Sequence, residues 1–169
     1  MNEIILKPIG VVRTSASDDV VRNSLTGVEG YIEIYPEYSV GLDGIEGFSH
    51  IIVIAYLHKT SEDHRKVLRV KHRKLVRLGL VSLNELPEVG VFATDSPHRP
   101  NPIALTIVEL IERRGNILYV KGLDLFDGTP VLDIKPYTPD RIIENPRVPE
   151  WYMRIYKKIR EKLGLDLPL

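Results

Sequence analysis

Cysteine is missing from the 169-residue sequence, and its absence excludes three kinds of chemistry. Without thiols the chain has no disulfide, no thiolate metal site and no cysteine nucleophile. This composition is compatible with a reducing compartment, and we expect a cytoplasmic protein. Glutamine is also absent and methionine occurs only twice, so side chains that are damaged by heat are few, as is typical of thermophilic proteins.

Long apolar runs and an excess of charge are missing as well. No segment approaches the roughly 18 apolar residues of a membrane span, and the opening stretch "MNEIILKPIG" contains an early acid, Glu3, and a break at Pro8. We therefore expect neither a signal peptide nor a membrane anchor. Lysine and arginine together number 23, as do aspartate and glutamate, so any nucleic acid must be bound by a local basic patch.

The apolar residues are arranged mostly as short strands. With 43% hydrophobic residues the chain is long enough for one domain with a substantial core. β-Branched and apolar runs bounded by Gly, Pro, Asp and Asn predict seven strands. These are Ile4 to Thr14, Gly30 to Tyr35, Ile51 to Leu57, Val89 to Thr94, Ile103 to Ile111, Ile117 to Leu125 and Val131 to Tyr137. The connections are too short for helical crossovers, so we predict an all-β fold, a compact seven-stranded or similar β-barrel over residues 1–144.

Two local signals refine this prediction. Asp127-Gly128 is a strong tight-turn pair and predicts a hairpin between the last two strands. Residues 145–169 are predicted to contain an amphipathic helix that starts near Pro149 and stops at Gly164, with Trp151, Ile155, Ile159 and Leu163 as its apolar stripe. The stripe is expected to pack on or beside the barrel; its basic outer face (Arg154, Lys157, Lys158, Arg160) is the alternative functional feature.

The loop in "ATDSPHRPNPIALT" is stiff because three prolines lie between positions 97 and 102. Each proline fixes its own φ and restricts the residue before it. His98, Arg99 and Asn101 would therefore be held in place at low entropic cost, which suits a preorganised site. The alternative is a structural connection in which Arg99 and Asn101 satisfy neighbouring carbonyls.

Four stretches carry a resemblance to a known family. They are "PIGVVRT", "GIEGFSHIIVIAYLHK", "GVFATDSPHRPNPIALTIVEL" and "VKGLDLFDGTPVLDIKPY", in this order over most of residues 9–137. Together they resemble the TsaA-like (TrmO) family of S-adenosylmethionine-dependent tRNA methyltransferases, and the composition suggests an archaeal or thermophilic member.

The resemblance implies a β-barrel methyltransferase, usually a homodimer, with S-adenosylmethionine bound near the dimer interface. Its implied substrate is the N6-threonylcarbamoyladenosine next to the tRNA anticodon, which is methylated on N6. Two positions depart from the family pattern: Asp95 replaces an arginine, and "VRN" stands where the family has Pro-Arg-Gln. Carried over by motif, the cofactor contacts are Arg22, Asn23, His58, Lys59, Leu105, Lys121, Gly122, Leu123 and Asp124.

Methyl transfer from a sulfonium needs alignment of donor and acceptor and the removal of one proton. The candidates for the base are Asp124, Asp127 and His98, and we take Asp127, His98, Arg99 and Asn101 as the candidate catalytic set. Each also has a structural interpretation, and Asp127 in particular is a natural turn residue before Gly128. No metal site is predicted.

The stretch "HRKVLRVKHRKLVR", from His64 to Arg77, contains no acid and is the candidate tRNA-binding strip. Its cations are Arg65, Lys66, Arg69, Lys71, Arg73, Lys74 and Arg77, and a solvated charged face is the alternative. Two rival functions stay open: a family member that binds S-adenosylmethionine without catalysis, and an RNA-binding barrel without methyltransferase activity.

Overall fold

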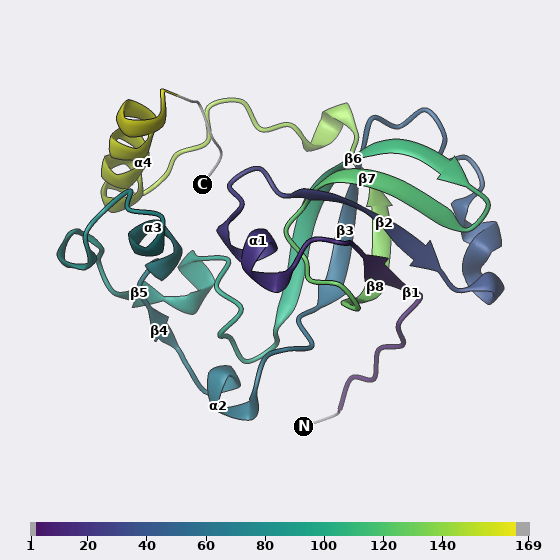
Figure 1. The fold of residues 1–169 in the computed structure, drawn as a ribbon, viewed down its shortest axis with the longest axis horizontal. Coiled ribbons are helices and arrows are strands. Elements are labelled where there is room, and N and C mark those ends of the chain that lie inside the picture. The colour runs from purple at the N-terminus through teal and green to yellow at the C-terminus, as the bar shows by residue number, and fades with distance from the viewer. Residues whose placement is uncertain (1–2, 165–169) are drawn as a thin grey trace. The chain divides into compact units, whose positions relative to one another are not determined.

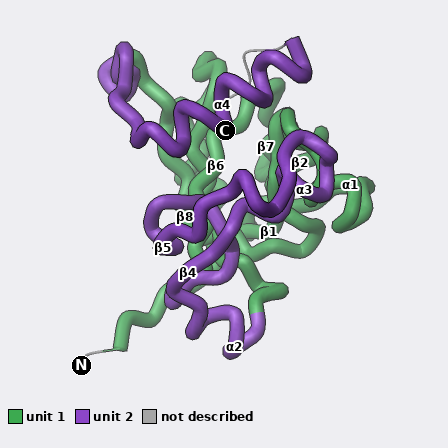
Figure 2. The backbone as a smooth tube through the Cα atoms, turned by 90° about the vertical axis from the view of Figure 1, so that its left-hand side faces the viewer, with its two compact units in different colours: residues 1–60, 102–139 green, residues 61–101, 140–169 purple. Residues whose placement is uncertain are grey.

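The computed structural model describes residues 3–164, and the chain divides into two compact units (Figure 2). Unit 1 comprises residues 1–60 and 102–139, and unit 2 comprises residues 61–101 and 140–169. Each unit is therefore built from two separate stretches of the sequence.

Unit 1 is a closed antiparallel barrel of six strands (Figure 1), so the predicted all-β barrel is confirmed. Neighbours around the barrel follow the order β1-β2-β7-β6-β3-β8. The strands are β1 (Gly10–Arg13), β2 (Val28–Ile34), β3 (His50–Tyr56), β6 (Ile103–Arg114), β7 (Ile117–Leu123) and β8 (Pro130–Pro136). Helix α1 (Asp18–Asn23) and the 3-10 helix η1 (Pro36–Leu42) also belong to this unit.

Every second side chain along a strand points into the barrel, because successive residues of a strand point to opposite faces. Val12, Ile32, Val53, Leu118 and Val131 are all fully buried. Burying a side chain of this size contributes about 1.5 to 3 kcal/mol, so the alternating pattern of branched residues supplies the main driving force for closing the sheet.

Two glycines allow the backbones of β7 and of the segment before β2 to come close together. A Cβ atom on Gly27 would lie 2.3 Å from the carbonyl carbon of Gly122, and both residues have positive φ, +77° and +87°. The register of β2 against β7 shifts next to this point, between Val28 and Glu29. Any larger side chain at position 27 would thus have to displace backbone, not a flexible side chain.

We expect Gly27→Ala to destabilise the protein by at least about 3 kcal/mol, through the clash and the positive φ together. For a chain of this size that lowers the melting temperature by roughly 6 to 12 °C. Gly115→Ala is the matched control, because Gly115 also has positive φ (+62°), but a Cβ atom added there would meet no other atom within 4 Å. Equal shifts for the two variants in differential scanning calorimetry would contradict this account.

The predicted hairpin at Asp127-Gly128 is wrong. The turn exists, with Gly128 at φ +78°, but β7 pairs with β2 and β6 whereas β8 pairs with β1 and β3. The tight hairpin lies instead between β6 and β7, around Gly115 at φ +62°. A turn dipeptide predicts that the chain reverses direction locally, but tertiary contacts decide which strand pairs with the strand that follows the turn.

Two predicted strands are much shorter than expected. The first begins only at Gly10, since residues 3–9 form no strand. The fourth is reduced to β5 (Val89–Gly90), which pairs with β4 (Arg69–Val70) in a separate two-stranded sheet of unit 2. This leaves the barrel with six strands.

The rest of unit 2 is short helical turns and one long helix. The turns are α2 (Glu62–Arg65), α3 (Arg73–Arg77), η2 (Leu83–Glu85), η3 (Val91–Ala93) and, at the boundary of the units, η4 (Pro139–Arg141). The long helix, α4 (Glu150–Leu163), follows Pro149 and is capped by Gly164 in the left-handed conformation, as predicted. Ile155 and Ile159 of its stripe are buried. No helix in residues 3–164 is long and apolar enough to cross a membrane.

Candidate functional site

A cluster of charged side chains surrounds the ring of Phe126 in unit 1. Lys59 Nζ lies 5.1 Å and Arg22 Cζ 5.5 Å from the centroid of the ring, so two cations face one aromatic side chain. Each cation is paired with an acid of α1: Lys59 Nζ with Asp18 Oδ2 at 2.5 Å, and Arg22 Nη1 with Asp19 Oδ1 at 2.8 Å. The cluster thus joins α1, the end of β3 and the turn after β7.

The local sequence explains why these groups meet. Ser17 caps α1 by accepting a hydrogen bond from Val20 N, and the two acids in the first turn of α1 complement the positive end of the helix. On the other side, the turn after β7 is fixed by Thr129, which is 1% exposed and donates a hydrogen bond to Phe126 O at 2.7 Å. Phe126 is therefore held by a rigid turn.

Asp127 is tied to β1 as well as to its own turn. Its Oδ1 accepts a hydrogen bond from the Thr14 backbone N–H at 3.1 Å. Within residues 3–164 its other oxygen, Oδ2, has no hydrogen-bond partner. The carboxylate therefore has a structural role through one oxygen and keeps a second oxygen as a proton or ligand acceptor.

His58 lies in the field of the same cluster. Burial lowers its pKa, and so does the neighbouring charge of Lys59, while the carboxylates of Asp18 and Asp127 act in the opposite direction. Because the net direction is downward, the imidazole is mainly neutral at pH 7 and retains a nitrogen that accepts a hydrogen bond or a proton.

The structure brings together four of the predicted site residues, namely Arg22, His58, Lys59 and Asp127. Phe126 and Asp18 were not predicted. Phe126 could have been noticed in the sequence, because an aromatic residue directly before an Asp-Gly turn does not belong to a core strand. Its cationic partners could not, because they are far away along the chain. Asp18 looks like an ordinary first-turn acid of a helix.

The remaining predicted cofactor residues are distributed around the barrel. Leu105 points outward from β6 and is 64% exposed. Lys121 forms an ion pair with Glu29 at 3.3 Å. Leu123 is fully buried in the barrel core, so only its backbone is available to a ligand. Asn23 ends α1, Gly122 lies at the close backbone approach, and Asp124 is exposed after β7.

The proline-rich loop belongs to unit 2, and its arginine is used within the loop. Arg99 donates hydrogen bonds to the carbonyl oxygens of Ser96 at 2.8 Å, Val91 at 3.0 Å and Thr94. This is the structural interpretation of Arg99. Asn101, by contrast, is exposed and has no side-chain partner within residues 3–164.

Two histidines and one acid complete this part of unit 2. The His98 ring stacks on His64, with centroids 4.0 Å apart, and burial followed by the charges of His64 and Arg73 lowers the His98 pKa. Asp95 is exposed, and its charge raises the pKa of His72 against a larger lowering by burial.

The basic strip from His64 to Arg77 runs through α2, β4 and α3. Its members differ in how far they reach solvent. Arg65 is anchored to Glu62 and to Pro100 O, and Lys71 and Lys74 are half-buried. The exposed cations are Lys66, Arg69, Arg73 and Arg77.

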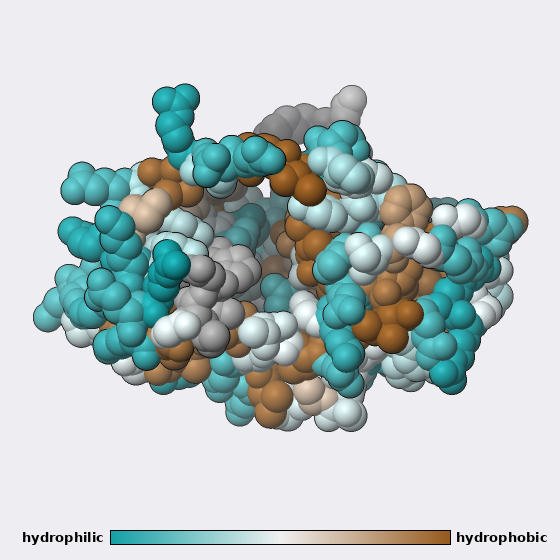
Figure 3. Space-filling view, turned by 90° about the horizontal axis from the view of Figure 1, so that it is seen from above, coloured by the Kyte–Doolittle hydropathy of each residue, from teal (hydrophilic) through white to brown (hydrophobic). Residues whose placement is uncertain are grey.

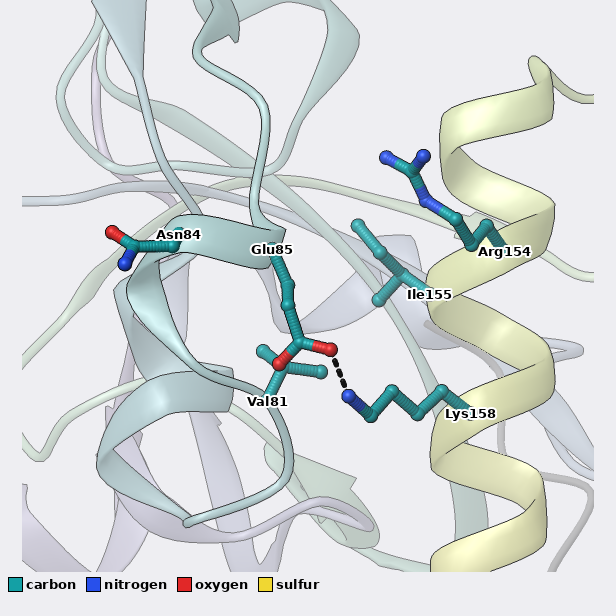
Figure 4. A pocket seen from close by; sticks show the side chains of 6 residues that line it. All are labelled: Val81, Asn84, Glu85, Arg154, Ile155 and Lys158. Carbon is teal, nitrogen blue, oxygen red and sulfur yellow. Dashed lines mark hydrogen bonds and ion pairs between the residues drawn. The ribbon is translucent and has the colours of Figure 1, made fainter.

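A shallow pocket of about 280 Å³ lies between α4 and η2, also in unit 2 (Figure 4). Lys158 forms an ion pair with Glu85 across it, and Val81 and Ile155 contribute apolar walls. Glu85 is further bound by the backbone and hydroxyl of Ser82, each at 2.8 Å, so its carboxylate is already satisfied. The pocket therefore lies where η2 packs against α4 within unit 2.

Known proteins are similar to this chain in fold and in sequence. A family model described as the tRNA-methyltransferase O N-terminal domain matches residues 20–141. A probable S-adenosyl-L-methionine-binding protein of Methanothermobacter thermautotrophicus is 44% identical over 141 residues, which cover 82% of this chain and 93% of that protein. A tRNA (adenine(37)-N6)-methyltransferase of Mus musculus is 42% identical over 105 residues, covering 62% of this chain and 22% of that protein. The crystal structure of TrmO from Pseudomonas aeruginosa matches with a TM-score of 0.65 at 25% identity, covering 98% and 77% of the two chains.

Proposed function

The chain belongs to the tRNA-methyltransferase O family, and on this premise we propose that it is an S-adenosylmethionine-dependent methyltransferase that acts on tRNA. Its proposed acceptor is N6 of the threonylcarbamoyladenosine next to the anticodon. The observation that carries the proposal is the cluster around Phe126, which gathers Arg22, His58, Lys59 and Asp127 from three separate parts of the barrel.

The residues of the cluster fit S-adenosylmethionine chemically. The cofactor carries a carboxylate, an ammonium and a sulfonium, and the cluster offers cations, carboxylates and an aromatic ring to match them. Lys59 and Arg22 are the candidates for the cofactor carboxylate. Asp18 is the candidate for its ammonium. The exposed Leu105 side chain and the backbone around Gly122 would hold the remainder.

When bound, the cofactor supplies an electrophilic methyl group, and the protein must align the acceptor nitrogen and remove its proton. The free Oδ2 of Asp127 is the proposed base, because its other oxygen is fixed by Thr14 N and the carboxylate is thereby oriented. Neutral His58, which feels the charge of Asp127, is the proposed group that passes the proton on or accepts a hydrogen bond from substrate. In unit 2, the exposed Asn101 is the proposed contact to the nucleotide, with Arg99 positioning the loop.

Two relatives favour a second candidate function. The proteins of M. thermautotrophicus and Pyrococcus abyssi, the latter 38% identical over 150 residues covering 86% of this chain and 74% of that protein, are named only as probable S-adenosyl-L-methionine-binding proteins. A chain that binds the cofactor without methyl transfer would show cofactor binding and no methylated tRNA. An RNA-binding barrel would instead show RNA affinity that does not respond to the cofactor.

We expect S-adenosylmethionine to stabilise the native protein by linkage. At 100 times its dissociation constant it should add about 2.7 kcal/mol to the free energy of unfolding, which raises the melting temperature by roughly 5 to 10 °C. Differential scanning fluorimetry with a cofactor titration measures this shift, and methionine plus adenosine at the same concentrations serves as the control. If millimolar cofactor did not shift the melting temperature, the result would contradict cofactor binding and therefore the proposed function.

We also propose that two copies associate through the outer face of β6. Ile103, Leu105, Ile107 and Ile111 alternate along this strand and are 38 to 64% exposed. Figure 3 shows that hydrophobic side chains are exposed among polar ones on the face seen from above. Since Leu105 is also a proposed cofactor residue, association there would place the cofactor near the interface.

Light scattering should accordingly report twice the 19.2 kDa of the single chain. Ile107→Glu is expected to give single chains, because a charge would be buried at the contact. Val40→Glu is the control, since Val40 is 74% exposed on η1 and is not part of the proposed contact face of β6. A wild-type mass of one chain at micromolar concentration would exclude the dimer.

A further inference from the structure

We propose that Phe126 binds the positively charged sulfonium of S-adenosylmethionine and makes the protein discriminate against the uncharged thioether of S-adenosylhomocysteine. The inference rests on the proposed function and adds to it a residue that determines specificity for the charged donor over the demethylated product.

The first support is the environment of the ring. Its face is already a place where cations gather, as Lys59 and Arg22 lie 5.1 and 5.5 Å from its centroid. An aromatic face attracts cations within about 6 Å through its quadrupole, and the attraction grows when water is excluded. The ring of Phe126 is half-buried. The preceding residue, Leu125, is 1% exposed, so the backbone that carries the ring is anchored in the core.

The second support is the charge balance of the cluster. Asp18, Asp19 and Asp127 contribute three negative charges, and Arg22 and Lys59 contribute two positive charges, so these five residues carry a formal charge of −1. S-Adenosylmethionine carries one net positive charge from its sulfonium, ammonium and carboxylate, and S-adenosylhomocysteine carries none. The cluster therefore complements the charged donor.

The two resident cations do not prevent this binding. Each is paired with its own aspartate of α1, at 2.5 Å for Lys59 and 2.8 Å for Arg22, so a third cation that reaches the ring does not meet an uncompensated charge. A thioether in the same place would gain only apolar contact with the ring. The ring therefore contributes to the difference between the two ligands, whereas general packing would affect both equally.

The test compares dissociation constants of the two ligands by isothermal titration calorimetry. In Phe126→Leu, the ratio of the S-adenosylhomocysteine constant to the S-adenosylmethionine constant should fall about fivefold, as expected for loss of one cation–π contact. Phe126→Tyr keeps an aromatic ring and should keep the wild-type ratio. Phe92→Leu is the control, because Phe92 is 82% exposed in unit 2 and lies outside the cluster.

If Phe126→Leu does not fold, Phe126→Met serves the same comparison, because its unbranched side chain has a similar volume and adapts more easily to the space that the ring leaves. An unchanged ratio in a folded variant that still binds both ligands overturns the inference and leaves the proposed function standing. Failure of the wild-type protein to bind either ligand overturns the proposed function and this inference together.

Discussion

Neutralising the exposed cations Lys66, Arg69, Arg73 and Arg77 should weaken tRNA binding on the order of a thousandfold at 0.1 M salt. Each lysine or arginine that neutralises a phosphate releases counterions and contributes about 0.7 to 0.9 to the slope of log affinity against log salt. Four lost contacts therefore reduce that slope by about 3. These four are chosen because they are the exposed cations of the strip, whereas Arg65, Lys71 and Lys74 are half-buried. Lys66 and Arg69 pair with Asp63 and Glu88, but ion pairs on an exposed surface are weak and are easily exchanged for a phosphate.

The experiment is a salt titration of tRNA affinity by fluorescence anisotropy, with all four residues changed to glutamine. The control changes Lys7, Arg13, Arg114 and Lys135, which belong to unit 1 and not to the strip, and it alters the net charge by the same amount. Cofactor binding should be retained in both variants. A slope that stays at the wild-type value in the strip variant would mean that tRNA contacts another surface.

The second large effect is expected at Asp127. Asp127→Asn should slow single-turnover methyl transfer by about a hundredfold or more, which is the usual contribution of a general base. Asparagine keeps the turn before Gly128 and still offers an oxygen to Thr14 N, so stability should change little. Cofactor affinity should also change little relative to the rate, which separates a chemical role from a binding role.

Asp124→Asn is the companion variant, because Asp124 is the other carboxylate among the candidate bases. A large loss of rate in Asp124→Asn and none in Asp127→Asn would move the base to Asp124 and leave Asp127 as a turn residue.

The proline-rich loop of unit 2 is tested in the same assay. Asn101→Ala should slow transfer about tenfold without changing stability, whereas Arg99→Ala should lower the melting temperature, since three carbonyls lose their donor.

Much of the barrel is predictable because its strands have a clear period. The strands now numbered β2, β3, β6, β7 and β8 are placed close to their true bounds from alternating branched residues. The helix α4 is predictable from Pro149 and Gly164 at its two ends. The predicted strand does not form over residues 4–8, because an apolar run becomes a strand only if another strand is available to pair with it.

The site is less predictable than the fold. Motif resemblance identifies Arg22, His58 and Lys59 individually, but no local pattern shows that Arg22 and Lys59 lie over one ring. The structural role of Arg99 cannot be predicted from the sequence either, because the direction of its guanidinium depends on how the proline-rich loop folds back on itself. Leu123 illustrates the opposite error, since a residue of a binding motif can contribute its backbone while its side chain fills the core.

Methyl transfer to defined tRNAs tests the central claim most directly. The protein is mixed in excess with S-adenosylmethionine and with tRNA that carries N6-threonylcarbamoyladenosine or lacks it, and the digested nucleosides are analysed by mass spectrometry. We expect the modified adenosine to gain the mass of one methylene group, with the added methyl on N6, and the unmodified tRNA to remain unchanged. Equal methylation of both tRNAs, or methylation of neither by a protein that binds the cofactor, would contradict the proposed function.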